Sequence, residues 1–152
     1  DAWILSRLAG LSERVTQGIS EYKFGEVASD LHTFFWNEFC DWYIEFSKAS
    51  LREGADPVAR LQTQRNLVFV LDSALRLLHP AMPFVTEALW EQLPHAEGEN
   101  AEALMVATWP EPETLARFKN AEAERAYAAS FPPCVPLAPA MASRRSRSSP
   151  LR

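Results

Sequence analysis

Residues 35–46 place an unusual amount of aromatic surface beside carboxylates, and this segment restricts the fold more than any other part of the chain. With about 3.6 residues per turn, its side chains divide into three stripes along a helix. The first stripe is aromatic and consists of Phe35, Phe39, Trp42 and Phe46; it continues backward along the helix through Leu31, Ala28 and Phe24. The adjoining apolar stripe consists of Trp36, Cys40 and Tyr43. The acidic flank consists of Glu38, Asp41 and Glu45. Two neighbouring apolar stripes predict a helix packed from two sides, with the first stripe facing the core.

Helical patterns continue along most of the chain. We expect helices up to about residue 21, over 24–49, over 57–78 and over 83–93, and a last helix that begins at Asn120. Asp56 followed by Pro57 is a strong start signal, because the carboxylate caps the helix and proline suits its first position. The pattern predicts an all-α fold, an antiparallel helical bundle of four to five helices.

The helix over 57–78 is nearly surrounded by other elements in this prediction. Between residues 67 and 78 only Asp72, Ser73 and Arg76 are polar, and Asp72 and Arg76 are expected to pair on the one solvent-facing edge. After residue 94 we expect an acidic loop and then an extended segment over 104–107.

Composition favours a soluble globular domain. The chain has 152 residues, 47% of them hydrophobic, and no window approaches the roughly 20 apolar residues that cross a bilayer. Residues 1–7 lack the features of a signal peptide, so a cytoplasmic location without membrane contact is expected. The two cysteines, Cys40 and Cys134, form no disulfide pattern, and no spacing of Cys and His suits zinc.

The net charge of −5 is unevenly distributed. Residues 131–152 carry four arginines and no acid, so residues 1–130 hold 11 basic and 20 acidic side chains. This composition argues against a general nucleic-acid clamp, which needs a concentrated positive field. Local contact with a folded RNA needs only a few cations and aromatic planes, and is compatible with it.

Possible catalytic or metal-binding side chains each have a structural interpretation. Glu38, Asp41 and Glu45 could form an acid pair or hold a metal, but their spacing is more typical of a solvated helix flank. His79, between Leu78 and Pro80, is expected to be a corner residue bonded to backbone rather than a base. His32 has no partner visible in the sequence. We expect neither a catalytic nor a metal site.

Residues 131–152 are rich in Pro, Ser and Arg and have no hydrophobic period, which predicts disorder. A basic arm that touches RNA is one alternative. A frameshift in the gene is the interpretation we favour, because a neighbouring reading frame over 138–147 can spell Arg-Ala-Arg-Tyr-Gly-Ile-Ser-Pro-Lys-Gln. The chain therefore divides into a bundle over 1–110, a linker with the start of a further helix over 111–130, and this tail.

Five segments carry a resemblance to a known family: residues 1–8, 22–26, 36–45, 77–90 and 107–110. Together they closely resemble, in order, the anticodon-binding domain of bacterial valyl-tRNA synthetases. The run His-Pro-Ala-Met-Pro-Phe at 79–84 is shared with isoleucyl and leucyl relatives, whereas Glu-Phe-Cys-Asp-Trp-Tyr at 38–43 favours valyl.

The resemblance implies a class I synthetase bundle that recognises the anticodon arm of tRNA(Val) and adjoins a catalytic domain. The whole enzyme would ligate valine to tRNA with ATP and magnesium. The His-x-Gly-His and Lys-Met-Ser-Lys-Ser type motifs of the ATP site are absent here, so no cofactor is expected in this chain. The resemblance also implies that the chain starts after the helix that usually opens the bundle and lacks the C-terminal coiled-coil arm. Exposed apolar surface and self-association are the expected consequence.

Candidate tRNA-binding residues follow from this resemblance. They are two aromatic residues, Trp36 and Tyr43, and four cations, Lys48, Arg52, Arg60 and Arg65. The rings could stack on unpaired bases, or pack against a missing helix, whereas Trp42 is expected in the core. The cations bracket the turn between the second and third helices, where they could contact phosphates or remain ordinary solvated charge.

Two other functions stay open on the sequence. The same aromatic stripes suit a helical protein-interaction module that binds an amphipathic helix. The equivalent domain of isoleucyl-tRNA synthetase is the other alternative, and it differs in the anticodon preferred.

Overall fold

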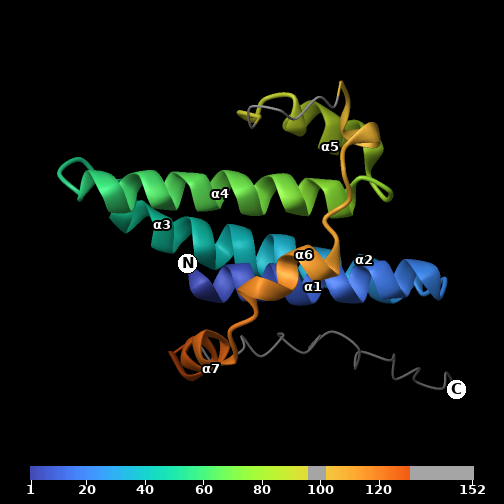
Figure 1. Ribbon diagram of the computed structural model, residues 1–152, viewed down its shortest axis with the longest axis horizontal. Coiled ribbons are helices and arrows are strands. Elements are labelled where there is room, and N and C mark those ends of the chain that lie inside the picture. Colours follow the sequence, from blue (N-terminus) through green and yellow to red (C-terminus); the bar gives the residue numbers. More distant parts are fainter. Residues whose placement is uncertain (96–101, 131–152) are drawn as a thin grey trace, which may run out of the picture.

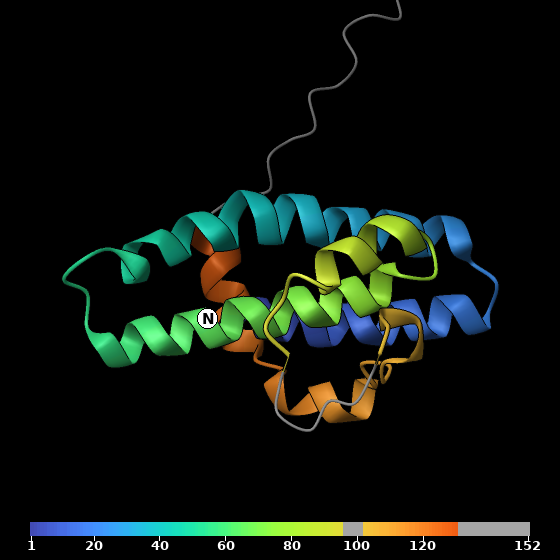
Figure 2. The same ribbon diagram turned by 90° about the horizontal axis from the view of Figure 1, so that it is seen from above.

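Three long antiparallel helical rods form the body of the computed structural model, which describes residues 1–95 and 102–130 (Figures 1 and 2). The rods are α1 (Ala2–Ser20), the continuous helix of α2 (Phe24–His32), η1 (Thr33–Tyr43) and α3 (Ile44–Leu51), and α4 (Pro57–Leu78). All regular structure in these described ranges is helical, which confirms the predicted all-α bundle. None of the helices there is long and apolar enough to cross a membrane.

The ends of the rods follow local chemistry. Tyr22 has a φ of 58° and turns the chain between α1 and α2. The Asp56 carboxylate accepts a hydrogen bond from Ala59 N at 3.0 Å and Pro57 opens α4, as predicted. Gly54 has a φ of 86° in the turn before this cap, a conformation that suits glycine.

The main core lies between the three rods. It is lined by fully buried residues of α1 and α4 and by one face of the long helix: Ile4, Leu8, Leu11, Val15, Val27, Leu31, Phe34, Phe39, Tyr43, Val70, Ala74 and Leu77. The predicted first stripe is therefore partly wrong, because Phe24 and Phe46 are 59% and 41% exposed. Ala28 is exposed as well, and Phe35 and Trp42 pack only partly buried at the edge of this core.

The physical reason for this difference is the π-helical winding of η1, whose i→i+5 hydrogen bonds place more residues in each turn. The buried series therefore runs Leu31, Phe34, Phe39, Tyr43 and Ser47, rather than in strict α-helical steps. A period of 3.6 residues could not predict this face.

A smaller core forms where α5 (Pro83–Trp90) and the 3₁₀ turn η2 (Leu104–Val106) lie over the C-terminal half of α4, on the side away from α1 (Figure 1). Leu75, Trp90 and Leu104 are its buried members. The extended segment predicted over 104–107 is wrong, since this segment forms the η2 turn. The Glu87 carboxylate accepts from Leu104 N at 2.9 Å and holds η2 against α5.

A polar network ties this smaller core together. Asp72 and Arg76 pair at 2.8 Å as predicted, but the edge that they occupy is covered, with side chains 21% and 9% exposed. Trp90 Nε1 donates to Asp72 Oδ1 at 2.7 Å, and Arg76 Nη1 donates to the Thr108 carbonyl at 3.0 Å. The prediction of a solvent-facing edge is wrong because α5 and the segment after η2 cover it.

The last elements pack on α1. They are α6 (Pro112–Leu115), η3 (Ala116–Phe118) and α7 (Ala121–Ser130), of which the sequence predicted only the last. Asn120 Oδ1 accepts from Ala123 N at 2.9 Å and caps α7 as expected. Tyr127 stacks on Trp3 with ring centroids 3.7 Å apart. The acidic loop expected near 96–101 and the tail over 131–152 lie outside the described residues.

Candidate nucleic-acid interface

The four candidate cations gather at the end of the bundle where the chain turns from α3 into α4 (Figure 1). Lys48 and Arg52 lie at the end of α3, and Arg60 and Arg65 lie in the first turns of α4; all four are exposed. Lys48 Nζ pairs with Glu45 Oε1 at 2.5 Å, and both side chains are more than half exposed. A pair of this kind is weak, so Lys48 can exchange its partner for a phosphate at little cost.

The three arginines of this end are more available than Lys48. None of the ion pairs found among the described residues involves Arg52, Arg60 or Arg65. The guanidinium groups thus face solvent, where bidentate hydrogen bonds to phosphate oxygens are geometrically available.

Trp36 lies on η1, about three helical turns from Lys48 along the long helix. Its ring is 47% exposed and stacks on His32, with centroids 5.2 Å apart and planes 6° from parallel. The structure therefore gives His32 the partner that the sequence did not reveal. The four-residue spacing on one helix was the signal, since such pairs are neighbours on a helix surface.

Tyr43, the other aromatic candidate, is a core residue that is 3% exposed. Its hydroxyl donates to Asp1 Oδ1 at 2.9 Å, and burial raises the pKa of the phenol to about 12. The expected stacking of this ring on a base is not available in this structure, because the ring packs inside the bundle. The shifted phase of η1 turns Tyr43 inward while Trp36 stays outside.

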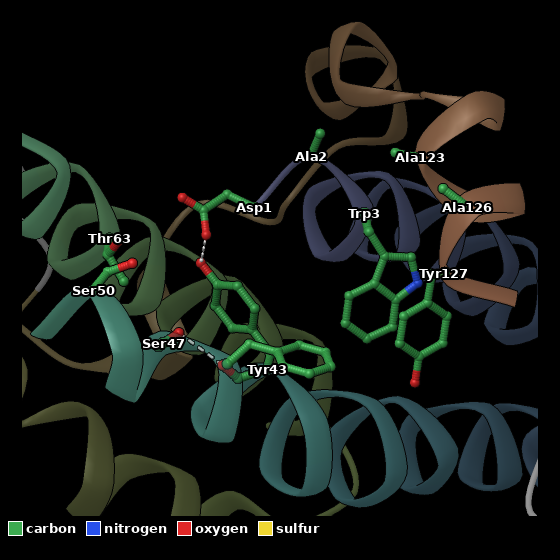
Figure 3. Close-up of a pocket in the computed structure, with 11 residues that line it drawn as sticks. Asp1, Ala2, Trp3, Tyr43, Ser47, Ser50, Thr63, Ala123, Ala126 and Tyr127 are labelled. Carbon is green, nitrogen blue, oxygen red and sulfur yellow. Dashed lines mark hydrogen bonds between the residues drawn. The ribbon is translucent and has the colours of Figure 1, made fainter. Parts of the chain in front are cut away.

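A cavity of about 500 Å³ opens beside Tyr43, between the start of α1, the long helix, α4 and α7 (Figure 3). Trp3 and Tyr127 form its aromatic wall, and Ser47, Ser50 and Thr63 supply hydroxyl groups. Its carboxylate, Asp1, already accepts hydrogen bonds from Tyr43 and from Asn66 Nδ2, at 2.9 and 2.8 Å. The carboxylate that faces the cavity thus has a structural role and ties the start of α1 to the long helix and to α4.

The acidic flank of the long helix has structural partners. Arg7 forms a forked pair with Glu38, whose side chain is only 13% exposed, and the hydrogen bond raises the pKa of Arg7. Glu38 is therefore an interhelical anchor to α1 rather than part of a solvated flank. Asp41 is exposed and Glu45 holds Lys48. Within residues 1–95 and 102–130, no three His, Cys, Asp or Glu side chains are grouped to hold a metal ion.

The remaining chemical candidates are also engaged. His79 Nδ1 lies 2.8 Å from Thr86 Oγ1, and Thr86 Oγ1 in turn donates to the Met82 carbonyl at 2.9 Å. His79 is thus a corner residue as expected, although its side-chain partner is Thr86 rather than backbone. Burial raises the pKa of the Cys40 thiol, which disfavours the reactive thiolate.

Among the described residues, exposed cations at the α3–α4 end and an exposed aromatic pair farther along the same helix form a surface suited to nucleic acid. The model of the family described as the anticodon-binding domain of tRNA ligase matches residues 1–131. The chain belongs to this anticodon-binding domain family. An all-helical bundle agrees with that membership.

Valine–tRNA ligases are among the proteins similar to this chain. The chain is 48% identical to a valine–tRNA ligase of Lactobacillus johnsonii, over 82% of the chain and 13% of that protein. It is 51% identical to a valine–tRNA ligase of Bacillus licheniformis and 50% identical to that of Geobacillus kaustophilus, each over 73% of the chain and 12% of the relative. The chain thus spans about one eighth of the length of these relatives.

Proposed function

We propose that this domain recognises the anticodon arm of tRNA(Val) as part of a valine–tRNA ligase. Membership of the anticodon-binding family carries the proposal, and identities near 50% to valine–tRNA ligases support the choice of tRNA. The isoleucyl alternative has no such support among these relatives.

The α3–α4 end is the proposed contact with the phosphate backbone. Arg52, Arg60 and Arg65 are exposed there and form no ion pair among the described residues, and Lys48 has only a weak surface pair. These contacts would position the arm without reading its sequence. The rest of the domain is acidic and would repel a phosphate backbone. A small cluster of cations is therefore enough to direct RNA to the α3–α4 end.

Trp36 is the proposed stacking residue for an unpaired base. Trp36 is 47% exposed, and its ring is held in a near-parallel stack with His32. Stacking of a base on an aromatic ring contributes roughly 1–3 kcal/mol. Tyr43 is left out of this proposal, since its ring belongs to the core.

The catalytic chemistry belongs elsewhere in the proposed enzyme. Valine activation with ATP and magnesium, and transfer to tRNA, would take place in a catalytic domain of the same polypeptide in the cytoplasm. We also propose that the domain extends through residue 130, because α6 and α7 pack on α1 and contribute Leu115 and Tyr127 to the main core.

The phosphate contacts are tested by replacing Arg60 and Arg65 together with Ala. The double variant should bind tRNA(Val) more weakly, and the slope of log K against log salt should become shallower by about one for each lost contact. Arg14→Ala with Lys23→Ala is the matched control, because it removes two exposed cations near the opposite, α1–α2 end. Equal slopes in the two double variants would refute the assignment of the α3–α4 end.

Recognition of the anticodon needs a separate titration. Fluorescence of the chain is measured with tRNA(Val) and with the same tRNA carrying a changed anticodon. We expect tighter binding of the native anticodon, and Trp36→Ala should reduce that preference. Equal affinity for both tRNAs would show electrostatic attraction without anticodon recognition, and would contradict the proposal.

A further inference from the structure

The outward face of α5 and η2 carries a concentration of exposed apolar side chains. This α5–η2 face is defined by Met82, Phe84, Val85, Leu89, Met105 and Val106. Phe84 is 92% exposed, and Met105 and Val106 are 75% and 66% exposed. Exposed apolar groups are ordinary when scattered, but six of them on and beside two elements that pack against each other are typical of an interaction surface.

The packing of α5 explains why this face is left open. α5 turns Thr86 and Trp90 toward α4, where they are 2% and 3% exposed. Phe84 lies two residues before Thr86 and therefore points away from α4. Leu104 of η2 joins the same small core, while the next two residues, Met105 and Val106, remain outside it. The smaller core thus uses one face of these elements and leaves the other without a neighbour among the described residues.

The charge of this region disfavours RNA as the partner. Residues 82–106 contain five glutamates and no lysine or arginine. Glu87, Glu91 and Glu102 belong to or flank the two elements that carry the face. A phosphate backbone would be repelled, and a protein surface with basic side chains around an apolar centre would be complementary.

The position of the face separates it from the proposed tRNA contact. The α5 lobe lies over the C-terminal half of α4, whereas Arg60 and Arg65 lie in the N-terminal turns of the same helix (Figure 1). Both surfaces can therefore be occupied at once. The valine–tRNA ligase relatives have about seven eighths of their length outside the matched segment, which supplies a covalently linked partner.

We propose that the α5–η2 face docks this domain onto the remainder of the tRNA ligase polypeptide, against an apolar patch rimmed by lysine or arginine. This inference rests on the proposed function for the identity of the partner. The docking would fix the direction in which the α3–α4 end points relative to the catalytic part. It is a contact between protein surfaces and involves no tRNA.

Hydroxyl-radical footprinting tests the docking, because Met82, Phe84 and Met105 are readily oxidised when exposed. The 152-residue chain is compared with a full-length Bacillus licheniformis ligase in which residues 1–130 of this chain replace the matching segment. We expect oxidation of these three residues to fall several-fold in the full-length protein. Tyr22, which is 81% exposed at the α1–α2 turn, is the internal control and should be oxidised equally in both.

A paired variant adds the second readout. Phe84→Glu with Leu89→Glu should restore strong oxidation of Met105 in the full-length protein, whereas Val58→Glu, at another exposed apolar position, should leave Met105 protected. Equal oxidation of Met105 in the short and long unsubstituted proteins overturns the proposal. The 152-residue chain is footprinted at a concentration at which gel filtration shows a monomer, so that self-association does not protect these residues. A full-length protein that only aggregates counts against the proposal too, because the face should be covered there. No tRNA is present, so these results are independent of the anticodon titration.

Discussion

Tyr43 joins the long helix to the start of α1 through a single buried hydroxyl. Its pKa of about 12 lies above the ordinary value of about 10 because burial disfavours the charged phenolate. The folded chain therefore holds this proton more tightly than the unfolded chain. Its contribution to stability is complete below about pH 10 and is lost as the pH rises toward 12.

Replacing Tyr43 with Phe tests this role. The variant should lose about 1 kcal/mol of unfolding free energy at neutral pH, since the hydrogen bond to Asp1 disappears. In an absorbance titration, the variant should also lose the tyrosinate signal of the phenol that ionises near pH 12. Denaturant unfolding and an absorbance titration measure the two effects. Tyr22→Phe, at an 81% exposed ring, should leave the unfolding free energy unchanged; an equal loss in both variants would contradict a special role for Tyr43.

Residue by residue, the sequence separated the aromatic candidates only in part. It identified Trp36 and Tyr43 as one stripe, yet the structure leaves Trp36 half exposed and buries Tyr43. Spacing alone cannot assign the two sides of a helix when the winding changes within it. The charged candidates were easier to locate, because the start and end signals around residues 51–57 already placed them at one turn.

At the scale of the element, helix limits were predictable where local chemistry fixes them. α4 begins at Pro57 and ends at Leu78, as the Asp56 cap and the later prolines indicated. The π-helical winding of η1, the η2 turn and the short α6 were not predicted. They depend on packing against α1 and α4, which no local propensity reports.

Gly18 offers a test of how closely α1 and α2 approach. A Cβ added there would lie 2.5 Å from Val27 Cγ2, closer than atoms can pack. Alanine favours a helix over glycine by about 1 kcal/mol, but overpacking costs roughly 1–3 kcal/mol. We expect Gly18→Ala to be destabilising by thermal unfolding, so that the steric effect exceeds the gain in helix propensity.

The matched control is Gly25→Ala, because a Cβ there would meet nothing within 4 Å. This change should be neutral or stabilising. Adding Val27→Ala to Gly18→Ala should recover part of the loss by making room, although it leaves a smaller core. A Gly18→Ala variant as stable as Gly25→Ala would contradict the close approach of the two helices.

At the scale of the whole molecule, Asp72 connects parts that are far apart in the sequence. It accepts from Arg76 on α4 and from Trp90 on α5, and Arg76 extends the network to the Thr108 carbonyl. Asp72→Ala leaves the mostly buried Arg76 without its carboxylate. We expect a loss of about 3 kcal/mol of unfolding free energy, measured by urea denaturation.

Asp30→Ala is the matched control for this prediction. Its carboxylate pairs with Arg14 Nε at 2.9 Å, close to the 2.8 Å of the Asp72–Arg76 pair, but both side chains are well exposed. Asp30→Ala should therefore lower the unfolding free energy by no more than about 1 kcal/mol. Similar losses in the two variants would show that burial adds nothing to the Asp72 network.

The division of the apolar interior into a larger and a smaller core has a kinetic consequence. Among the described residues, the smaller core has three buried members, Leu75, Trp90 and Leu104, and two of them lie on α5 and η2. These elements can detach from α4 in a brief local opening while the three rods remain assembled. Backbone amides of α5 should therefore exchange with solvent deuterium sooner than those of the C-terminal half of α4. The α5–η2 side of the bundle would then open and close locally while the three rods stay folded.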